Sequence, residues 1–284
     1  MSYFDPKLAR MKTLFLSLAL LGSLATAAPA NGDNATMPTQ TSHYNVIEFR
    51  RYQVKPERRE DFVSYFDTLF PEAFQQLGAL ALGQFTEPEV ADRFTWLRGF
   101  RDMDARAIVN GTFYYGPVWK EHRQQLNDLI IDNDDVLLLR PLDAAHAVPV
   151  MAAVDPVREK MGTRGIVVAQ LFPVKPGDVE RFAHLAAPAF DAYAKAGARD
   201  AGVLVTLDVK NNFPQLPVRT DGPFVVWLGI LPDMEAVDQL LRPITVQAAA
   251  SLQQGGLLRG QPQLLVLKPT PRSRMRWLDG KAAR

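Results

Sequence analysis

The chain has 284 residues, of which 47% are hydrophobic and 22% are charged, as in an ordinary globular protein that holds one large domain or two small ones. Its formal net charge of +1 gives no electrostatic footprint for nucleic acid. It contains no cysteine, which excludes disulfides, thiolate catalysis and cysteine-ligated zinc or iron–sulfur sites.

Residues 1–30 have the pattern of a secretory signal peptide. An apolar run at Leu14–Leu24 follows three basic residues and precedes a segment of small residues. The run is too short to span a membrane comfortably, although an uncleaved anchor is the alternative. We predict cleavage near Ala30, with Met11 as an alternative start. The mature protein is then expected to be periplasmic or secreted, with no membrane contact beyond the signal.

Residues 31–42 are polar and contain proline, which predicts a linker. A strand is expected at Asn45–Tyr52, because apolar and polar side chains alternate there. We assign Ile47 and Phe49 to the face that packs on helices. A helix is expected from Glu57, with an interruption at Pro71.

The next elements form a β-β-α-α-β series. Strands are expected at Leu80–Thr86 and Phe94–Phe100, and Asp102 leads into a helix. Glycine and proline predict breaks in that helix at Gly111 and at Gly116-Pro117. A further helix starts near Pro117, and an apolar strand follows at 136–139.

Residues 43–142 resemble the NIPSNAP family. The resemblance rests on ordered motifs: Glu48, Arg50 and Tyr52 in an E-x-R-x-Y strand, Lys55-Pro56, a strand with Trp96, Asp102 with Arg106, the G-P-V-W at Gly116–Trp119, and a terminal V-L-L-L-R-P. It implies a ferredoxin-like unit of the dimeric α/β-barrel group, whose members bind small molecules. It does not imply a particular reaction.

Three segments of this unit recur later in the same order. Val54-Lys55-Pro56 returns 120 positions on, Trp96-Leu97 returns 131 positions on, and Leu139-Arg140-Pro141 returns 128 positions on as Leu267-Lys268-Pro269. Such ordered self-similarity indicates a duplicated β-α-β-β-α-β unit. We place the second, divergent unit at 164–270, after a linker at 143–163. The basic tail, 271–284, is predicted to be solvated.

The predicted fold is therefore α+β, with two tandem ferredoxin-like units. Each sheet has helices on one face only, so its other apolar face must be buried. Packing the two sheets face to face as an intrachain dimeric α/β-barrel solves this within one chain. In this arrangement Glu48, Arg50 and Tyr52 are expected to point into the space between the sheets.

The polar groups of the first unit are missing from its copy. At the 120-residue offset, Glu48 and Arg50 become Val168 and Gln170. Buried charges need a partner or a ligand, so the first unit is the candidate site. Its candidate ligand-binding residues are Glu48, Arg50, Tyr52, Trp96, Arg98, Tyr115, Trp119 and His122.

Each candidate also has a structural interpretation. Glu48 and Arg50 can form an ion pair with each other, Trp119 can be a core anchor, and His122 can be a hydrogen-bonded structural histidine. Arg98 can lie exposed at a strand end. No metal-ligand spacing and no nucleotide or hydrolase motif occurs in the sequence, so no metal or cofactor is predicted, and catalytic residues are not assigned.

Three functions follow as hypotheses. The leading one is an exported module that binds a small apolar or aromatic ligand in the barrel cavity of the first unit. The second is an enzyme similar to the cofactor-independent monooxygenases of the same group, in which Arg50, Tyr52 and His122 position and deprotonate the substrate. The third is a protein-association module. A homodimer is compatible with each of them.

Overall fold

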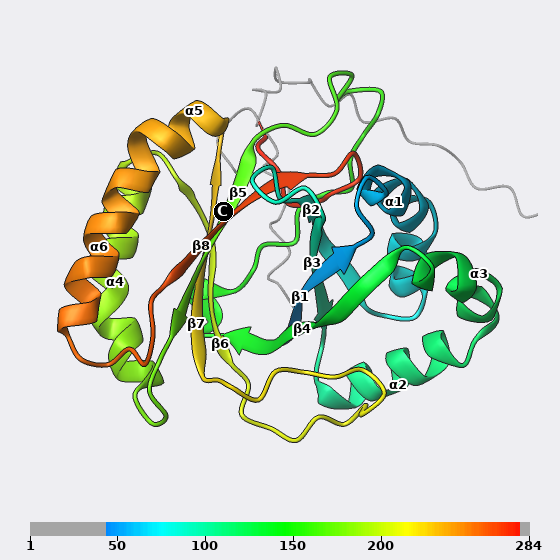
Figure 1. Cartoon of the computed structure of the whole chain (residues 1–284), viewed down its shortest axis with the longest axis horizontal. Helices are drawn as coiled ribbons and strands as arrows, with labels where there is room; N and C mark the ends of the chain where they lie inside the picture. The colour runs from blue at the N-terminus through cyan, green and yellow to red at the C-terminus, as the bar shows by residue number, and fades with distance from the viewer. Residues whose placement is uncertain (1–43, 279–284) are drawn as a thin grey trace, which may run out of the picture. The chain divides into compact units, whose positions relative to one another are not determined.

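The computed structural model describes residues 44–278, so the predicted signal peptide and the linker at 31–42 lie outside the described residues. Two β-α-β-β-α-β units follow one another (Figure 1). The first unit consists of β1 (Val46–Val54), α1 (Arg59–Gln76), β2 (Leu80–Thr86), β3 (Arg93–Phe100), α2 (Met103–Tyr114), α3 (Pro117–Asn127) and β4 (Ile130–Pro141). The second consists of β5 (Ile166–Pro173), α4 (Val179–Lys195), β6 (Arg199–Thr206), β7 (Phe224–Leu231), α5 (Met234–Ala236), the π-helical η2 (Val237–Leu241), α6 (Arg242–Gln254) and β8 (Gln263–Pro269).

The eight strands form one closed barrel in the order β1-β3-β2-β8-β5-β7-β6-β4. Each unit contributes an antiparallel four-stranded sheet of the same order, β4-β1-β3-β2 and β8-β5-β7-β6. Two short seams join the sheets: two residue pairs between β2 and β8, and three between β4 and β6. The intrachain α/β-barrel predicted from the sequence is confirmed. Figure 1 shows α1–α3 outside one sheet and α4–α6 outside the other.

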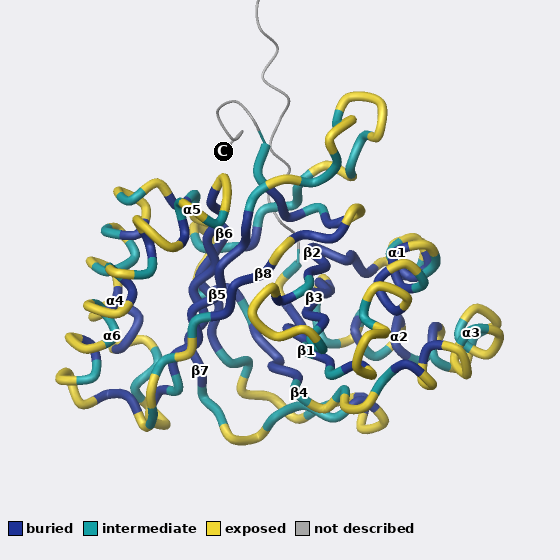
Figure 2. The backbone as a smooth tube through the Cα atoms, turned by 45° about the horizontal axis from the view of Figure 1, so that its top comes forward, coloured by how far each residue is buried: buried dark blue, intermediate teal, exposed yellow. Residues whose placement is uncertain are grey.

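The barrel interior is an apolar core to which both units contribute. Ile47, Phe49 and Leu97 from the first unit share this core with Val167 and Leu228 from the second. In Figure 2 the strands are largely buried, whereas the outer faces of the helices are exposed. The close packing of these apolar side chains holds the two sheets together.

The predicted faces of β1 are therefore wrong. Ile47 and Phe49 point into the barrel, whereas Tyr52 belongs to the core between the sheet and α1–α3. Glu48 and Arg50 share the face of Tyr52, because side chains two apart on a strand point the same way. The period-2 pattern separates the two faces but does not say which one meets the helices. Charged groups on the barrel face would have met the apolar sheet of the second unit.

Two of the predicted helix breaks are absent. Helix α1 continues through Pro71, and α2 continues through Gly111 to Tyr114. The break at Gly116-Pro117 is present: Gly116 is the extended N-cap of α3 and Pro117 is its first residue. Proline suits that position, because the first helical residue needs no N–H partner.

The start of the predicted solvated tail is packed instead. Met275 lies in the barrel core, and Ser273 and Arg276 are buried. The Arg276 guanidinium donates from Nε and Nη2 to the Glu159 carboxylate, both at 2.6 Å, which ties the tail to the segment that joins the two units. Within residues 44–278, no helix is long and apolar enough to cross a membrane.

Candidate functional site

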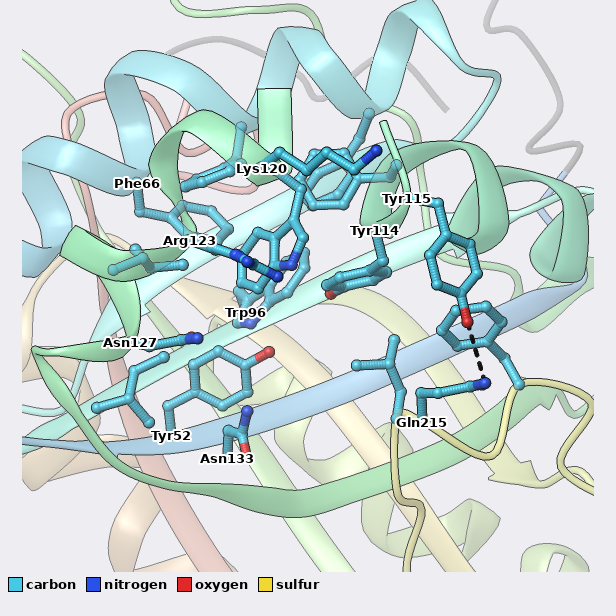
Figure 3. Close-up of a pocket in the computed structure, with 18 residues that line it drawn as sticks. Tyr52, Phe66, Trp96, Tyr114, Tyr115, Lys120, Arg123, Asn127, Asn133 and Gln215 are labelled. Atoms are coloured by element: carbon cyan, nitrogen blue, oxygen red, sulfur yellow. Dashed lines mark hydrogen bonds between the residues drawn. The ribbon is translucent and has the colours of Figure 1, made fainter. Parts of the chain in front are cut away.

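A cavity of about 390 Å³ lies between the sheet of the first unit and its helices (Figure 3). This is within the size range of small-molecule sites. Most of its wall consists of aromatic and apolar side chains, with a few polar groups. The lining residues are Tyr52, Phe66, Phe70, Phe74, Trp96, Phe113, Tyr114, Tyr115, Trp119, Lys120, Arg123, Leu126, Asn127, Ile130, Asn133, Phe213, Gln215 and Leu216.

The aromatic wall follows from the periodicity of the sequence. Phe66, Phe70 and Phe74 recur at every fourth position of α1, so they line one face of that helix. The turn at Gly116-Pro117 redirects the chain, and Trp119 then packs on Tyr114 with ring centroids 5.0 Å apart. The wall is thus built from side chains that hold one another in place.

A loop of the second unit completes the cavity. Residues 207–223 connect β6 to β7, and Phe213, Gln215 and Leu216 of this loop line the cavity. Gln215 Nε2 donates to the Tyr115 hydroxyl at 3.1 Å, as Figure 3 shows. The Phe213 ring lies 5.9 Å from that of Tyr114. Both units therefore contribute to one site.

Behind the cavity floor, three arginines surround a single carboxylate. Glu48 Oε2 accepts from Arg50 Nη1 at 3.0 Å and from Arg98 Nη2 at 2.6 Å, and Glu48 Oε1 accepts from Arg106 Nε at 2.8 Å. All four side chains are fully buried. We call these four residues the Glu48 cluster. The predicted Glu48–Arg50 pair is present, and it is half of a larger network.

Electrostatics keep Glu48 ionised in this cluster. Burial alone would raise its pKa, but the guanidinium groups of Arg98, Arg50 and Arg106 outweigh burial and hold the pKa of Glu48 far below its usual range. The pKa of Arg106 is lowered, because burial and the neighbouring arginines act against the attraction of Glu48. The cluster therefore carries three cations against one carboxylate.

Several buried donors near the floor have no hydrogen-bond partner. They are Arg50 Nη2, Arg98 Nη1, Arg106 Nη2 and Trp96 Nε1. Aromatic faces partly replace those partners: the Arg98 guanidinium lies 4.8 Å from the Phe74 ring centroid and 5.1 Å from that of Trp96. The region is therefore rich in donors and positive charge.

Tyr52 connects the Glu48 cluster to the cavity. Arg50 Nε donates to its hydroxyl oxygen at 2.8 Å, which leaves the phenolic hydrogen available for another acceptor. In Figure 3 the hydroxyl groups of Tyr52 and Tyr114 point into the same part of the cavity. Burial raises the pKa of Tyr52, while Arg50 acts in the opposite direction. Tyr52 is therefore a neutral donor at pH 7.

The predicted site residues fall into three groups: four that line the cavity, three that lie behind it, and His122, which lies elsewhere. Tyr52, Trp96, Tyr115 and Trp119 line the cavity. Glu48, Arg50 and Arg98 lie behind it, and Arg98 is fully buried rather than exposed at a strand end.

His122 lies elsewhere. Its Nδ1 is 2.7 Å from the Tyr65 hydroxyl, in a groove between α1 and α3 that shares no lining residue with the cavity. The site itself is also displaced from the prediction, because it lies between sheet and helices and not inside the barrel.

Sequence reasoning missed Arg106 and the loop of the second unit. Arg106 was visible as part of the Asp102/Arg106 motif, but nothing in its spacing showed that α2 would turn it toward Glu48. Its Nη1 also donates to Asn211 Oδ1 at 3.0 Å and Asn212 Oδ1 at 2.8 Å, so it joins the cluster to the loop. Lys120 and Arg123 at the cavity mouth were missed as well.

The second unit has lost the whole cluster. In the first unit, Arg50 lies opposite Trp96 and Glu48 lies opposite Arg98. At the equivalent positions of the second unit, Gln170 lies opposite Trp227 and Val168 lies opposite Gly229. At the 131-residue offset, Arg106 corresponds to Val237, which is fully buried. An apolar core that includes Tyr193, Trp227 and Leu241 occupies the layer between this sheet and its helices.

One family model matches the chain over residues 47–146, and its description is NIPSNAP. Residues 47–146 are a NIPSNAP domain. The NIPSNAP domain covers the four strands of the first unit except Val46, so the Glu48 cluster belongs to it, and so does the cavity wall apart from Phe213, Gln215 and Leu216. No curated protein matches the chain at a significant level.

Solved structures of low sequence identity share the fold of the whole described part. A candidate monooxygenase from Lactobacillus acidophilus NCFM is 13% identical with a TM-score of 0.52, over 83% of this chain and 100% of its own. A candidate monooxygenase from Fusobacterium nucleatum is 11% identical with a TM-score of 0.54, over 84% and 98%. An anthrone oxidase-like protein is 14% identical with a TM-score of 0.53, over 83% and 95%. These likenesses show the α/β-barrel fold alone.

No group of three or more histidine, aspartate or glutamate side chains could hold a metal ion among residues 44–278. The polar side chains that line the cavity carry hydroxyl, amide and cationic groups. Such a wall can bind, orient and donate hydrogen bonds to an aromatic molecule.

Proposed function

We propose that the NIPSNAP unit binds a small aromatic molecule in the cavity between its sheet and α1–α3. The observation that carries this proposal is the wall itself, in which aromatic rings from β1, β3, α1, α2 and α3 and from the 207–223 loop surround about 390 Å³ of space. Edge-to-face and stacked contacts with such rings favour a planar aromatic guest. The Tyr52 hydroxyl, held by Arg50, gives that guest a fixed polar anchor.

Tryptophan fluorescence tests the proposal, because two of the four tryptophans, Trp96 and Trp119, line the cavity. Binding of 1-naphthol or 2-naphthamide should change the emission of the wild-type protein. The change should shrink in Trp119→Phe and persist in Trp277→Phe, since Trp277 packs beside the barrel core. An emission change that survives Trp119→Phe undiminished would place the ligand elsewhere, and no binding of any naphthalene derivative would end the proposal.

A second candidate function is oxygenation of an electron-rich aromatic without a cofactor. The observation that favours it is the Arg50–Tyr52 hydrogen bond at the floor of an aromatic cavity. A substrate carbonyl or enol oxygen placed there would be polarised by a donor backed by positive charge. The fold likeness to candidate monooxygenases and to an anthrone oxidase-like protein makes this chemistry worth testing.

Anthrone and dioxygen provide the assay. Oxidation of the methylene to a carbonyl places one oxygen atom in the product and releases the other as water with the two methylene hydrogens, so no cofactor is required. We expect Tyr52→Phe to lose at least tenfold in turnover. His122→Ala should retain full turnover, because His122 lies outside the cavity. No product with the wild-type protein would leave the binding function alone.

We further propose that the protein is exported, on the basis of the charge and hydropathy pattern of residues 1–30. Expression of the full chain followed by fractionation and N-terminal sequencing tests this. A mature N-terminus near residue 30 in the periplasm or medium is expected, and an intact N-terminus in the cytoplasm would contradict it.

A further inference from the structure

Positive charge lies behind the floor of the cavity and at its mouth. Behind the floor, the Glu48 cluster holds three guanidinium groups against one carboxylate. At the mouth, Lys120 and Arg123 of α3 belong to the lining and are exposed. In Figure 3 the end of the Arg123 side chain lies near Trp96 in the view, and the Lys120 side chain lies above the aromatic side chains.

No negative charge balances these groups inside the cavity. None of the described lining residues is an aspartate or a glutamate. The single carboxylate of the floor, Glu48, is already shared among three arginines. Because an unbalanced buried charge is costly, a molecule that brings a negative charge is favoured over a neutral one of the same shape.

The hydrogen-bonding groups of the floor point to the same chemistry. Trp96 is 1% exposed, lines the cavity, and has an indole N–H without a partner. The Tyr52 hydroxyl accepts from Arg50 and is left with a hydrogen to donate. These groups offer donors, which a carboxylate or phenolate oxygen can accept.

We infer that the ligand of this cavity is an aromatic anion, a planar ring system that bears a carboxylate or an acidic hydroxyl. This inference rests on the proposed function, since it names the class of molecule that the same site takes. The aromatic rings of the wall contact the apolar part of the ligand. The cationic groups behind the floor and at the mouth attract its negative charge. Selectivity arises because an amide or an ammonium of the same shape lacks that electrostatic complement.

Three ligands of one shape and different charge separate this inference from the proposed function. Titration calorimetry with 2-naphthoate, 2-naphthamide and 2-naphthylmethylammonium, at low salt, compares an anion, a neutral molecule and a cation. We expect the anion to bind at least tenfold more tightly than the amide and the cation to bind most weakly. Equal affinities would overturn the inference and keep the proposed function, whereas no binding of any of the three would overturn both.

Variants show which residues cause the preference for the anion over the neutral amide. The double variant Lys120→Met/Arg123→Met should reduce the ratio of naphthoate to naphthamide affinity severalfold while leaving naphthamide affinity nearly unchanged. Arg101→Met is the matched control, because Arg101 is 74% exposed and lies outside the cavity. Tyr52→Phe should reduce the same ratio from the floor side. A ratio that neither the double variant nor Tyr52→Phe changes would overturn the assignment of these groups.

Salt gives an independent readout of the mouth residues. Charges that face solvent are screened within roughly 10 Å at 0.1 M salt and within about 3 Å at 1 M. The naphthoate preference of the wild-type protein should therefore fall as sodium chloride rises, and the fall should be shallower in Lys120→Met/Arg123→Met. An equal slope in both proteins would show that these two residues do not contact the anion.

Discussion

Glu48 is the residue on which the interior of the NIPSNAP unit depends. Its two carboxylate oxygens accept hydrogen bonds from three arginines on β1, β3 and α2. A buried ion pair of this kind adds little to stability compared with an apolar core, but removing one partner leaves buried charge uncompensated. The cluster is thus a point where a single substitution has a large effect.

Glu48→Gln should lower the free energy of unfolding by about 3–5 kcal/mol, the usual cost of breaking a buried ion pair. Chemical denaturation measures this loss. Glu60→Gln is the control, because Glu60 is 80% exposed and its change should fall within about 0.5 kcal/mol. Adding Arg98→Met to Glu48→Gln should restore part of the stability by removing one uncompensated cation. No loss in Glu48→Gln would show that the three arginines do not depend on its charge.

Asp67 of α1 is a second buried carboxyl group, and it is only 5% exposed. Burial raises the pKa of Asp67 from 3.8 to about 6, against the opposing effect of Arg272. The folded protein therefore binds this proton more tightly than the unfolded chain does. The stability linked to Asp67 is present below about pH 4 and is lost as the pH rises through 6.

Asp67→Asn should accordingly be more stable than the wild type at pH 7.5, by about 3 kcal/mol for a shift of roughly two pKa units. At pH 4 the two proteins should be nearly equal. Denaturation curves at both pH values measure the difference, and Asp61→Asn on the same helix, 60% exposed, should show no such change. The same difference at both pH values would mean that titration of Asp67 is not its cause.

At the scale of elements, the loop at 207–223 joins the second unit to the site of the first. Arg106 of α2 holds it through Asn211 and Asn212, and Asn212 Nδ2 also donates to the Met103 carbonyl at 2.6 Å. Hydrogen bonds to a charged group contribute about 1.5–3 kcal/mol each. These bonds keep the loop over the cavity.

Asn211→Ala/Asn212→Ala should release the loop, because Arg106 Nη1 then loses both acceptors. Amide hydrogen exchange of residues 207–223 should become at least about tenfold faster, which corresponds to about 1.4 kcal/mol of local opening. Exchange in β1 and β3 should stay unchanged. Lys210→Ala, at an exposed position of the same loop, is the control. Unchanged exchange in the double variant would show that other contacts hold the loop.

The sequence predicted the elements better than their orientation. Strand β2 was predicted at its observed bounds, and the Glu48–Arg50 pair follows from two residues on one face of a strand. The face of β1 that points into the barrel could not be predicted, because both faces of this strand are buried. The alternation therefore does not distinguish a buried face from an exposed one. Arg106 and the loop enter the site through contacts between distant segments, which spacing does not record.

At the scale of the whole molecule, two units with the same strand order carry different interiors. The first retains a charged cluster and a cavity, whereas Val168, Gln170, Gly229 and Val237 replace the cluster in the second. The second unit instead provides half of the barrel core and the loop over the cavity. The cavity and the charged cluster thus belong mainly to the first unit, and the second unit supports them.

One ligand should therefore bind per chain. Titration calorimetry with the tightest naphthalene derivative should give a stoichiometry near one, and Tyr52→Phe should weaken that site. Gln170→Leu, at the equivalent of Arg50 in the second unit, should leave both affinity and stoichiometry unchanged. Two equivalent sites per chain would show that the interior of the second unit also opens to ligands.

The first unit should not form a folded monomer by itself. Its sheet buries Ile47, Phe49 and Leu97 against the second unit, and the seams with β6 and β8 would be left as open edges. We expect residues 43–142 expressed alone to aggregate or to pair with a second copy, as light scattering after size exclusion would show. Co-expression with residues 143–284 should restore a soluble one-to-one complex, since the two sheets then cover each other. A stable monomer of 43–142 with native circular dichroism would mean that the barrel core is dispensable, and the case for mutual burial as the force that joins the units would fail.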